Sequence, residues 1–322
     1  VQRQSTADGG DFNRVIGADA RVGIGQDWTA DAWVGHSETP GRSGDAFSWS
    51  ARAAYQTRDY NHSVRVLQVG DAFNPEVGFM GRPAGYRFDE LMLMRLVRSP
   101  KWTRVRQWNP HISLRRYVGT DGFLQSSWAH IDLTEAEFNT GGKFGPDINI
   151  YTEGLQRPFE IAPGVVLQPG QYRYSLPGID WGTDPSAAFS FLTRIEMGQF
   201  YSGHKSGGNV TFTARRGASI SSSLTLDYQD VNLPEGDFIR QLIGLKVAYF
   251  FTPRVFVQSL TQYNNQAEIF TANLRFAWLN TAGTGLFIVF NDGEQADSFT
   301  SWRAPVARSL TIKYTKQIGS GG

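Results

Sequence analysis

The sequence contains no cysteine among its 322 residues. This absence excludes thiol catalysis, a disulfide framework and a cysteine-ligated zinc centre. It is compatible with export through an oxidising compartment, although many cytosolic domains also lack cysteine. The absence of cysteine therefore excludes these kinds of chemistry and does not decide the cellular compartment.

The sequence also lacks long apolar runs and an excess of charge of one sign. No segment approaches the ~20 apolar residues of a membrane helix, and the mean hydropathy is −0.34. Lys and Arg total 31 against 30 Asp and Glu, a net charge of +1, so neither a nucleic-acid partner nor a polybasic membrane patch is indicated. The low hydropathy excludes only a helical membrane protein, because a membrane-spanning barrel has apolar residues at every second position.

Helical periodicity is missing too, and period-two alternation of apolar residues takes its place. The clearest alternating segments are 16–24, 47–56, 220–228, 243–251, 270–278 and 309–315. They are longer than the roughly 5–6 residues of an average soluble strand and match the about 9–11 residues of a tilted membrane strand. Aromatic residues reach 13% and glycine 35 residues, which suits the interface girdles and strand bends of a barrel.

The expected connections alternate between short and long. Short turns are predicted at 25–27, 57–59, 98–100, 182–185, 215–217, 252–254 and 281–283. Longer loops rich in Gly, Pro and Asp are predicted at 37–45, 71–85, 155–170, 200–207, 231–237 and 291–305. Short periplasmic turns and long external loops are typical of outer-membrane barrels.

These patterns predict an all-β fold, a single large antiparallel transmembrane β-barrel over residues 1–318. About 18 strands are expected, with about 16 as the alternative, because 85–98, 253–263 and 284–291 alternate poorly. Residues 1–6 form a short first strand that suggests removal of upstream sequence, and no signal peptide is visible at the start. Gly319-Ser320-Gly321-Gly322 resembles an appended linker.

One face of the predicted strands carries charges of both signs. A sheet in hydrocarbon must close, because every backbone polar group needs a protein partner. Charges on the enclosed face are tolerated only against water or each other. The predicted lumen-facing charges are Asp19, Arg21, Arg52, Arg194, Glu196, Arg215, Asp227, Lys246, Arg275 and Lys313. A barrel near this size encloses an aqueous channel unless it is plugged.

Two segments supply candidate constriction or binding residues. Asn74 and Pro75 are expected to form a turn, and Phe73 and Phe79 to fold the loop against the lumen wall; calcium chelation by the oxygen ligands of residues 71–76, Glu76 among them, is the alternative. Phe159 and Glu160, with Tyr172 beyond them, belong to a segment that either constricts the lumen or caps one side as a hairpin. Aromatic residues in such loops suit stacking on sugar rings, although they serve equally well as an interface girdle.

No catalytic residue, metal or cofactor is predicted. Gly23-Ile24-Gly25 lacks the spacing of a nucleotide fingerprint. No Gly-x-Ser-x-Gly elbow is present, although strands can bring a distant Ser/His/Asp set together. The histidines lack the His-x-x-x-His spacing of a zinc site; they are His36, His62, His111, His130 and His204.

Several long segments carry a family resemblance. They are 11–19, 71–79, 158–164 with 169–173, 231–237 and 309–314. On these segments, residues 10–317 resemble the C-terminal barrel domain, of unknown function, of bacterial proteins with a carbohydrate-binding family 9 module. The resemblance implies an outer-membrane protein with a glycan-binding partner domain, and it supplies no catalytic residues. One departure is the end of the last strand, where residues 314–318 run into glycines instead of closing on an aromatic residue.

Two functions are therefore expected from the sequence. The first is a pore or transport channel with a mixed-charge lumen, linked to glycan uptake or binding and surrounded by outer-membrane lipids. The second is a non-conducting anchor or scaffold for a carbohydrate-binding module or an envelope complex. A soluble enzyme is a distant third, and the oligomeric state is left open.

Overall fold

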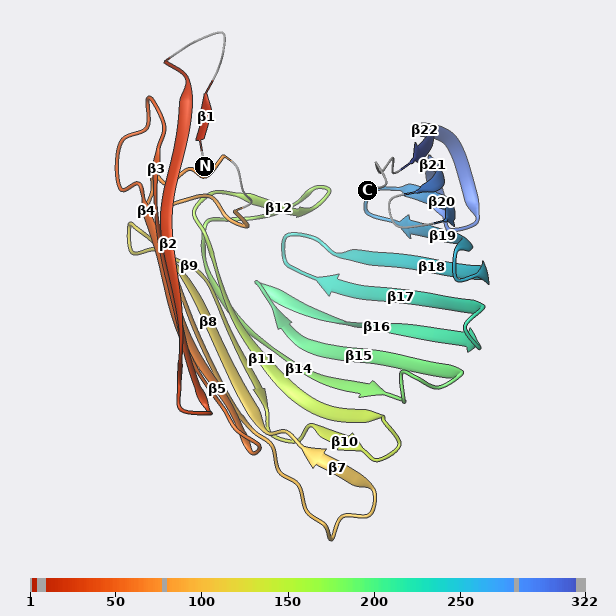
Figure 1. Ribbon diagram of the computed structural model, residues 1–322, viewed down its shortest axis with the longest axis horizontal. Coiled ribbons are helices and arrows are strands. Elements are labelled where there is room, and N and C mark those ends of the chain that lie inside the picture. Colours follow the sequence, from red (N-terminus) through yellow and green to blue (C-terminus); the bar gives the residue numbers. More distant parts are fainter. Residues whose placement is uncertain (1, 5–9, 77–79, 281–283, 317–322) are drawn as a thin grey trace, which may run out of the picture. The chain divides into compact units, whose positions relative to one another are not determined.

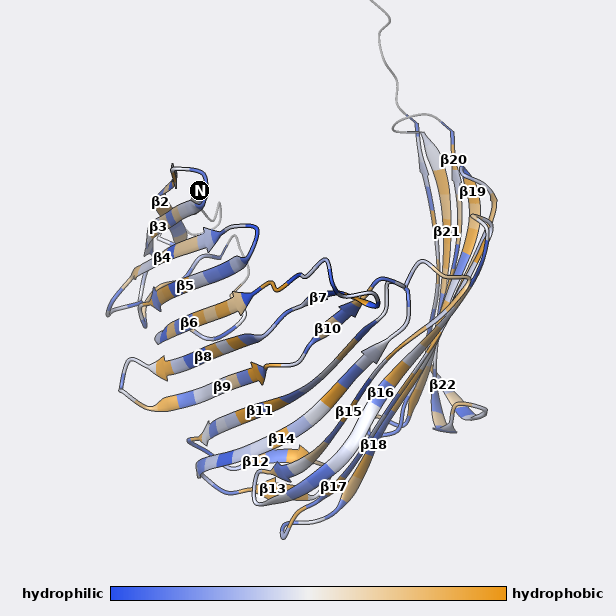
Figure 2. Cartoon of the chain, turned by 90° about the horizontal axis from the view of Figure 1, so that it is seen from below, coloured by the Kyte–Doolittle hydropathy of each residue, from blue (hydrophilic) through white to orange (hydrophobic). Residues whose placement is uncertain are grey.

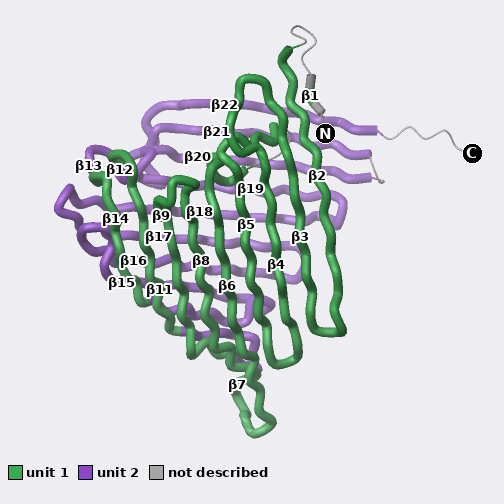
Figure 3. The backbone as a smooth tube through the Cα atoms, turned by 90° about the vertical axis from the view of Figure 1, so that its left-hand side faces the viewer, with its two compact units in different colours: residues 1–137, 146–159, 167–177 green, residues 138–145, 160–166, 178–322 purple. Residues whose placement is uncertain are grey.

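The computed structural model describes residues 2–4, 10–76, 80–280 and 284–316, which form strands, turns and bends with no helix among them. The predicted all-β, antiparallel class is confirmed: apart from one small hairpin, the strands form one large antiparallel sheet (Figure 1). The contacts between residues divide the chain into two compact units (Figure 3). Unit 1 comprises residues 1–137, 146–159 and 167–177, and unit 2 comprises 138–145, 160–166 and 178–322.

The strands follow one another in chain order. The first half contains β1 (Gln2–Gln4), β2 (Phe12–Ile24), β3 (Trp28–Glu38), β4 (Phe47–Gln56), β5 (Tyr60–Val69), β6 (Tyr86–Arg95), β7 (Val105–Trp108), β8 (His111–Gly119), β9 (Leu124–Asp132), β10 (Ala136–Phe138) and β11 (Lys143–Leu155). The second half contains β12 (Phe159–Ala162), β13 (Val165–Leu167), β14 (Gly170–Gly182), β15 (Phe189–Phe200), β16 (Gly203–Arg216), β17 (Ile220–Asn232), β18 (Phe238–Thr252), β19 (Val255–Asn264), β20 (Ile269–Leu279), β21 (Gly285–Ser298) and β22 (Ser301–Thr315).

In unit 1 each long strand pairs antiparallel with the next one. The ladder runs from β2 through β3, β4, β5 and β6 to β8, β9 and β11, while β1 covers only the start of β2. Successive side chains of a strand point to opposite faces, so the register assigns every residue to a face. The face that carries Asp19, Arg21 and Arg52 is the charged face of unit 1, and its opposite is the apolar face of unit 1.

Unit 2 repeats this arrangement with longer strands. From β15 to β22 every strand pairs antiparallel with its successor, and β15 also pairs with the end of β14. All seven charges predicted for this part of the chain share one face by register, which is the charged face of unit 2. Figure 2 shows the resulting succession of hydrophobic and hydrophilic segments along the strands. Strand β22 pairs with β21 and is exposed along its whole length.

A buried cluster of unit 1 lies where the loop between β5 and β6 folds back over the charged face. Val69, Phe73, Tyr86 and Phe88 are buried together there, with Tyr117 packed against them. The β5–β6 loop thus covers this part of the charged face. Phe73 packs against the sheet in this cluster, and Phe79 lies outside the described residues.

Most predicted turns agree with the structure, and those at 25–27, 57–59 and 252–254 separate consecutive strands. The long loops at 37–45, 71–85 and 231–237 also recur within a few residues. The short turn predicted at 98–100 is wrong, because the connection from β6 to β8 is longer and includes β7, which is joined back by a bridge from Val97 to Trp108. The turn predicted at 281–283 lies outside the described residues.

The long loop predicted at 200–207 is wrong. Strand β15 continues to Phe200 and β16 begins at Gly203, so only Tyr201 and Ser202 turn the chain, with Tyr201 in the left-handed region at φ 49°. The glycines that suggested a loop lie inside β16. A Cβ at Gly208 would come within 2.2 Å of the carbonyl oxygen of Arg194 on β15, so these glycines permit a close backbone approach.

The loop predicted at 291–305 is wrong as well. Strand β21 runs to Ser298 and β22 starts at Ser301. The acidic residues that suggested a loop are held across the strand pair, because Arg308 of β22 donates to Asp292 at 2.7 Å and to Glu294 at 2.6 Å. Cross-strand pairing of opposite charges supports a strand where polarity alone suggests a loop.

A substitution test follows from the close approach at β16. Gly208→Ala should lower the free energy of unfolding by about 1–3 kcal/mol, because the added methyl group overlaps a backbone oxygen that moves only with its strand. Gly23→Ala, where no atom lies within 4 Å of the added carbon, should be neutral or slightly stabilising. Denaturant titration followed by far-UV circular dichroism measures both, and equal stabilities would contradict the packing.

Candidate functional site

The charged face of unit 1 carries a transverse row of directly opposed side chains, here called the unit 1 charge row. It crosses eight strands at one level and consists of Arg21, Asp31, Arg52, Arg65, Glu90, Arg115, Trp128 and Tyr151. The predicted residues Arg21 and Arg52 belong to it. Asp19 lies two residues from Arg21 on the same face, opposite Trp33. Basic side chains outnumber acidic ones along the row.

Short-range contacts link the members of the row. Arg115 donates from Nε to Glu90 at 2.7 Å, and its guanidinium lies 4.9 Å from the ring centre of Trp128. Arg52 approaches Asp31 at 3.5 Å, and Arg65 donates to the Ser50 hydroxyl at 3.2 Å. These side chains are partly exposed, so each pair contributes only about 0–1 kcal/mol to stability. The main effect of the row is on the local field.

Arg65, Glu90 and Arg115 are not among the charges predicted from the sequence. Two pairs of adjacent charges, Asp89-Glu90 and Arg115-Arg116, obscure the alternation in this region. In each pair, one side chain points to one face of the sheet and its neighbour points to the other. Charged residues therefore do not alternate with period two in this region. The strand pairing shows which residues share the charged face with Arg52, because it sets Arg65 opposite Arg52, Glu90 opposite Arg65 and Arg115 opposite Glu90.

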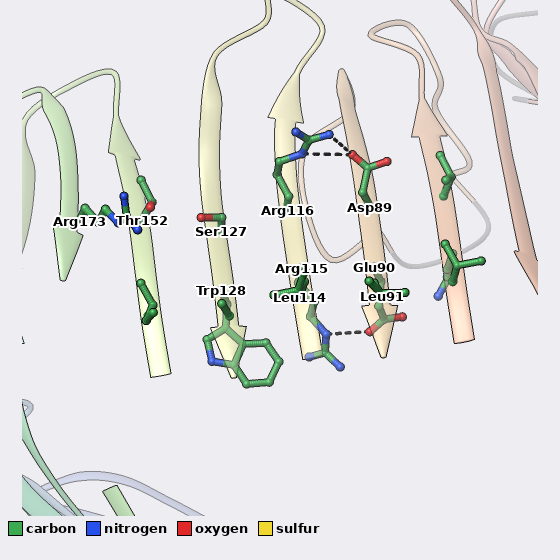
Figure 4. Close-up of a pocket in the computed structure, with 15 residues that line it drawn as sticks. Asp89, Glu90, Leu91, Leu114, Arg115, Arg116, Ser127, Trp128, Thr152 and Arg173 are labelled. Atoms are coloured by element: carbon green, nitrogen blue, oxygen red, sulfur yellow. Dashed lines mark hydrogen bonds and ion pairs between the residues drawn. The ribbon is translucent and has the colours of Figure 1, made fainter. Parts of the chain in front are cut away.

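The other member of each pair lies on the apolar face of unit 1, in a cleft of about 540 Å³. There Arg116 donates to one Asp89 oxygen from Nη2 at 2.6 Å and from Nε at 3.2 Å, and Arg87 donates to the other oxygen at 2.9 Å. Figure 4 shows this ion pair beside the Arg115–Glu90 pair, with Ser127, Thr152 and Arg173 nearby. The cleft places these charged side chains among apolar ones, which include Val64, Leu114 and Ile150.

A tighter ionic network lies on the charged face of unit 2. Arg194 binds Asp180 at 2.6 Å and Glu196 at 3.3 Å, and Lys205 binds Glu196 at 2.7 Å. The side chains of Glu196 and Lys205 are 13% and 15% exposed, so solvent screens this network less than the unit 1 charge row. Glycine at 178 leaves room for Arg194, because a Cβ there would lie 2.7 Å from the guanidinium.

The remaining predicted charges of unit 2 share this face and are dispersed over it. Asp227 is 3.4 Å from Arg240, and Arg215 donates to the backbone oxygen of Pro185. The Arg275 guanidinium lies 4.9 Å from the ring centre of Phe287, and Lys313 is opposite that same phenylalanine. Lys246 lies between Ser223 and Leu260. These side chains line the face rather than form one site.

The loop residues predicted as constriction or binding groups have structural partners. Asn74 donates to the Thr39 hydroxyl at 3.3 Å, its backbone N–H donates to Ser37 at 2.8 Å, and Glu76 pairs with Arg3. Arg3 also donates to Asp11 at 2.9 Å, and this hydrogen bond lowers the pKa of the Asp11 carboxyl. These contacts favour the structural role over calcium chelation.

The segment predicted as a loop at 155–170 forms the β12–β13 hairpin. The Gly164 N–H donates to Glu160 across the turn at 2.8 Å, and Val165 packs against Gly236 of the β17–β18 loop. Phe159 is exposed, and Tyr172 donates to the backbone oxygen of Gln168 at 2.8 Å. This hairpin is compatible with both alternatives for the segment, a constriction of the lumen and a cap over one side.

Three ligand-type side chains that sequence spacing did not connect also meet on the charged face of unit 1. His111, His130 and Asp132 each offer one donor atom within 4.8 Å of the others. These residues lack the spacing of a helical zinc motif because they lie on neighbouring strands and not on one helical turn. Cross-strand register, with His111 directly opposite Asp132, is the signal that joins them.

Comparisons with known proteins add no relative. No protein-family model, curated protein or solved structure matches the chain. Within the residues that the structure describes, no helix is long and apolar enough to cross a membrane.

The unit 2 network gives a stability prediction. Arg194→Met should lower the free energy of unfolding by roughly 1–3 kcal/mol, because Asp180 and Glu196 lose the cation that they share and both are partly buried. Arg194→Lys should recover only part of this loss, since an ammonium lacks the fork of donors. Exposed Arg216→Met is the matched control, and equal unfolding midpoints for Arg194→Met and Arg216→Met would contradict the network.

Proposed function

We propose that the chain is a bacterial outer-membrane β-barrel whose charged faces line an aqueous interior that passes a small solute. The observation that carries the proposal is the large apolar surface exposed on the opposite faces. Ile16 on β2 is 79% exposed and Phe189 on β15 is 80% exposed. Further exposed apolar side chains on these faces are Val22, Val34, Trp49, Val64, Leu114, Ile195, Met197, Phe212, Tyr249, Leu274 and Leu310.

Water is a poor solvent for such a surface. Soluble monomers rarely expose contiguous apolar patches beyond a few hundred Å², and these side chains recur at every second position along strand after strand. Lipid is the environment in which exposure of this kind is favourable. A barrel would also supply the partners that the backbone groups of an edge strand such as β22 need in hydrocarbon.

Strand length supports the same environment. Strands β2, β17 and β18 contain 13, 13 and 15 residues, which exceeds the about 9–11 residues needed to cross a bilayer on a tilt. The mixed charges of the opposite faces then require an aqueous interior. The resemblance to barrel domains that accompany a carbohydrate-binding module extends the proposal to glycans as the solute class.

One observation favours the second candidate, a non-conducting anchor or scaffold. The β5–β6 loop covers part of the charged face of unit 1, where Phe73 is buried. Arg82 of the same loop donates to Ser126 at 3.0 Å and lies 3.9 Å from the ring centre of Tyr117. A loop held in this way narrows whatever space the charged face encloses.

Planar-bilayer recording of the purified chain separates the two candidates. A pore gives steady, salt-dependent current steps. A protein that migrates as a heat-modifiable barrel and yet gives no current supports the anchor. A chain that neither inserts into bilayers nor shows heat-modifiable migration contradicts both.

The unit 1 charge row predicts ion selectivity. Glu90→Gln removes an acidic member from a row dominated by arginine, so the variant pore should shift towards anions. The neighbouring Asp89→Asn, on the apolar face, should leave the selectivity unchanged. Reversal potentials under a KCl gradient measure the difference. Equal shifts for the two variants would mean that the faces are assigned incorrectly.

The assignment of the apolar face has its own test. Leu274→Arg places a charge on the apolar face of unit 2 and should cost about 2–4 kcal/mol of stability in a bilayer. Gln262→Arg makes the same change on the charged face of the adjacent strand and should be tolerated. Unfolding titrations in lipid vesicles provide the comparison, and equal losses would contradict a lipid-facing Leu274.

A further inference from the structure

We infer that His111, His130 and Asp132 form a binding site for a divalent transition metal, with Zn²⁺ as the fitting ion. His111 begins β8, and His130 and Asp132 end the neighbouring β9. The register sets His111 opposite Asp132 and His130 opposite Ser113, so all three side chains lie on the charged face of unit 1. The Nε2 atoms of the two imidazoles are 3.0 Å apart.

The partner of each imidazole Nδ1 decides where its proton lies. His111 Nδ1 is 2.9 Å from the backbone oxygen of Asn109, which can only accept a hydrogen bond. Nδ1 of His111 must therefore carry a hydrogen and donate it. In the neutral imidazole, the Nε2 atom of His111 then keeps its lone pair.

The same conclusion holds for His130 through the orientation of Asn149. Trp128 donates from its indole nitrogen to Asn149 Oδ1 at 2.7 Å, and Asn149 Nδ2 donates to Asp147 at 2.6 Å. These two contacts fix which atom of the amide faces His130. His130 Nδ1 lies 3.0 Å from that Oδ1, so it too donates, and Nε2 of His130 also keeps its lone pair.

Two lone pairs facing each other at 3.0 Å repel unless a positive centre lies between them. A metal ion satisfies both nitrogens at once. Two imidazole nitrogens bound to tetrahedral Zn²⁺ at ~2.0–2.1 Å are ~3.4 Å apart, so a small outward movement of the rings admits the ion. Histidine ligands that donate their other nitrogen to a carbonyl or amide oxygen are the usual outer-shell arrangement of zinc sites.

Asp132 completes a ligand set of two nitrogens and one oxygen. Its Oδ1 accepts from the backbone N–H groups of Thr134 at 2.9 Å and Glu135 at 2.7 Å, and the residue is 3% exposed. These hydrogen bonds fix the carboxylate next to the imidazoles. Imidazole ligands select zinc, nickel or copper over calcium and magnesium, which prefer oxygen. Three protein ligands leave the fourth position for water or another ligand.

The test is metal titration of the full chain folded in detergent, with Co²⁺ as a spectroscopic probe and Zn²⁺ as its competitor. We expect one Co²⁺ per chain with the intense visible bands of tetrahedral coordination, displaced by Zn²⁺. His111→Ala and His130→Ala should each lower the affinity at least ~100-fold, because each removes one of three ligands. His204→Ala, a histidine outside the cluster, should bind as the unchanged chain does.

Further variants keep the inference falsifiable if an alanine variant misfolds. His111→Gln and Asp132→Asn preserve side-chain size and should still lose tetrahedral Co²⁺ bands. Asn149→Ala leaves the three ligands intact, frees the ring of His130 and should weaken binding ~10–100-fold. A chain that binds no Co²⁺, or that binds it equally after His111→Gln, would overturn the site and mean that the imidazoles share a proton.

The consequence for transport rests on the proposed pore. His130 is two residues from Trp128 of the unit 1 charge row, so a bound Zn²⁺ would add positive charge to the same face. Micromolar Zn²⁺ should then shift the reversal potential towards anions in the unchanged pore and not in His111→Gln. Metal titration needs no pore, so a silent bilayer with intact Co²⁺ binding would count against the channel alone.

Discussion

Strand register is the constraint on which the rest of this structure depends. Side chains alternate between the faces of a sheet, so a slip of one residue in any strand pair would move its charges to the apolar face. The row from Arg21 to Tyr151 exists because seven successive pairings keep the same parity. In unit 2, glycines of β16 permit a close approach of the backbones, and β15 and β16 are joined by the two-residue turn at Tyr201.

The sequence predicts the class of fold well because a strand with one apolar and one polar face has apolar residues at every second position. This pattern can be recognised without knowing which strands pair. The alternating segments at 16–24, 243–251 and 270–278 all lie within strands. The failures at 200–207 and 291–305 have one physical cause. Glycine and charge usually mark a loop, but here they serve the sheet, as a close approach at Gly208 and as a cross-strand ion pair at Arg308.

The candidate sites were less predictable than the fold. Charges such as Arg52 and Arg194 could be assigned to a face from parity alone. Their partners could not, because a contact such as Arg194 with Asp180 depends on which residues oppose one another across strands. The imidazole pair shows this limit most clearly, since His111 and His130 are far apart in the sequence and meet only through the pairing of β8 with β9.

The exposed strand β22 has a consequence for how this protein reaches its final state. Each of its residues is exposed, and β21 satisfies one side of it. An unpaired second side would be a row of backbone donors and acceptors, which is a template for any extended chain. For the proposed barrel, β22 would therefore be the strand to protect before closure, and a chaperone that shields it should raise the yield of folded protein more than one that shields an interior strand.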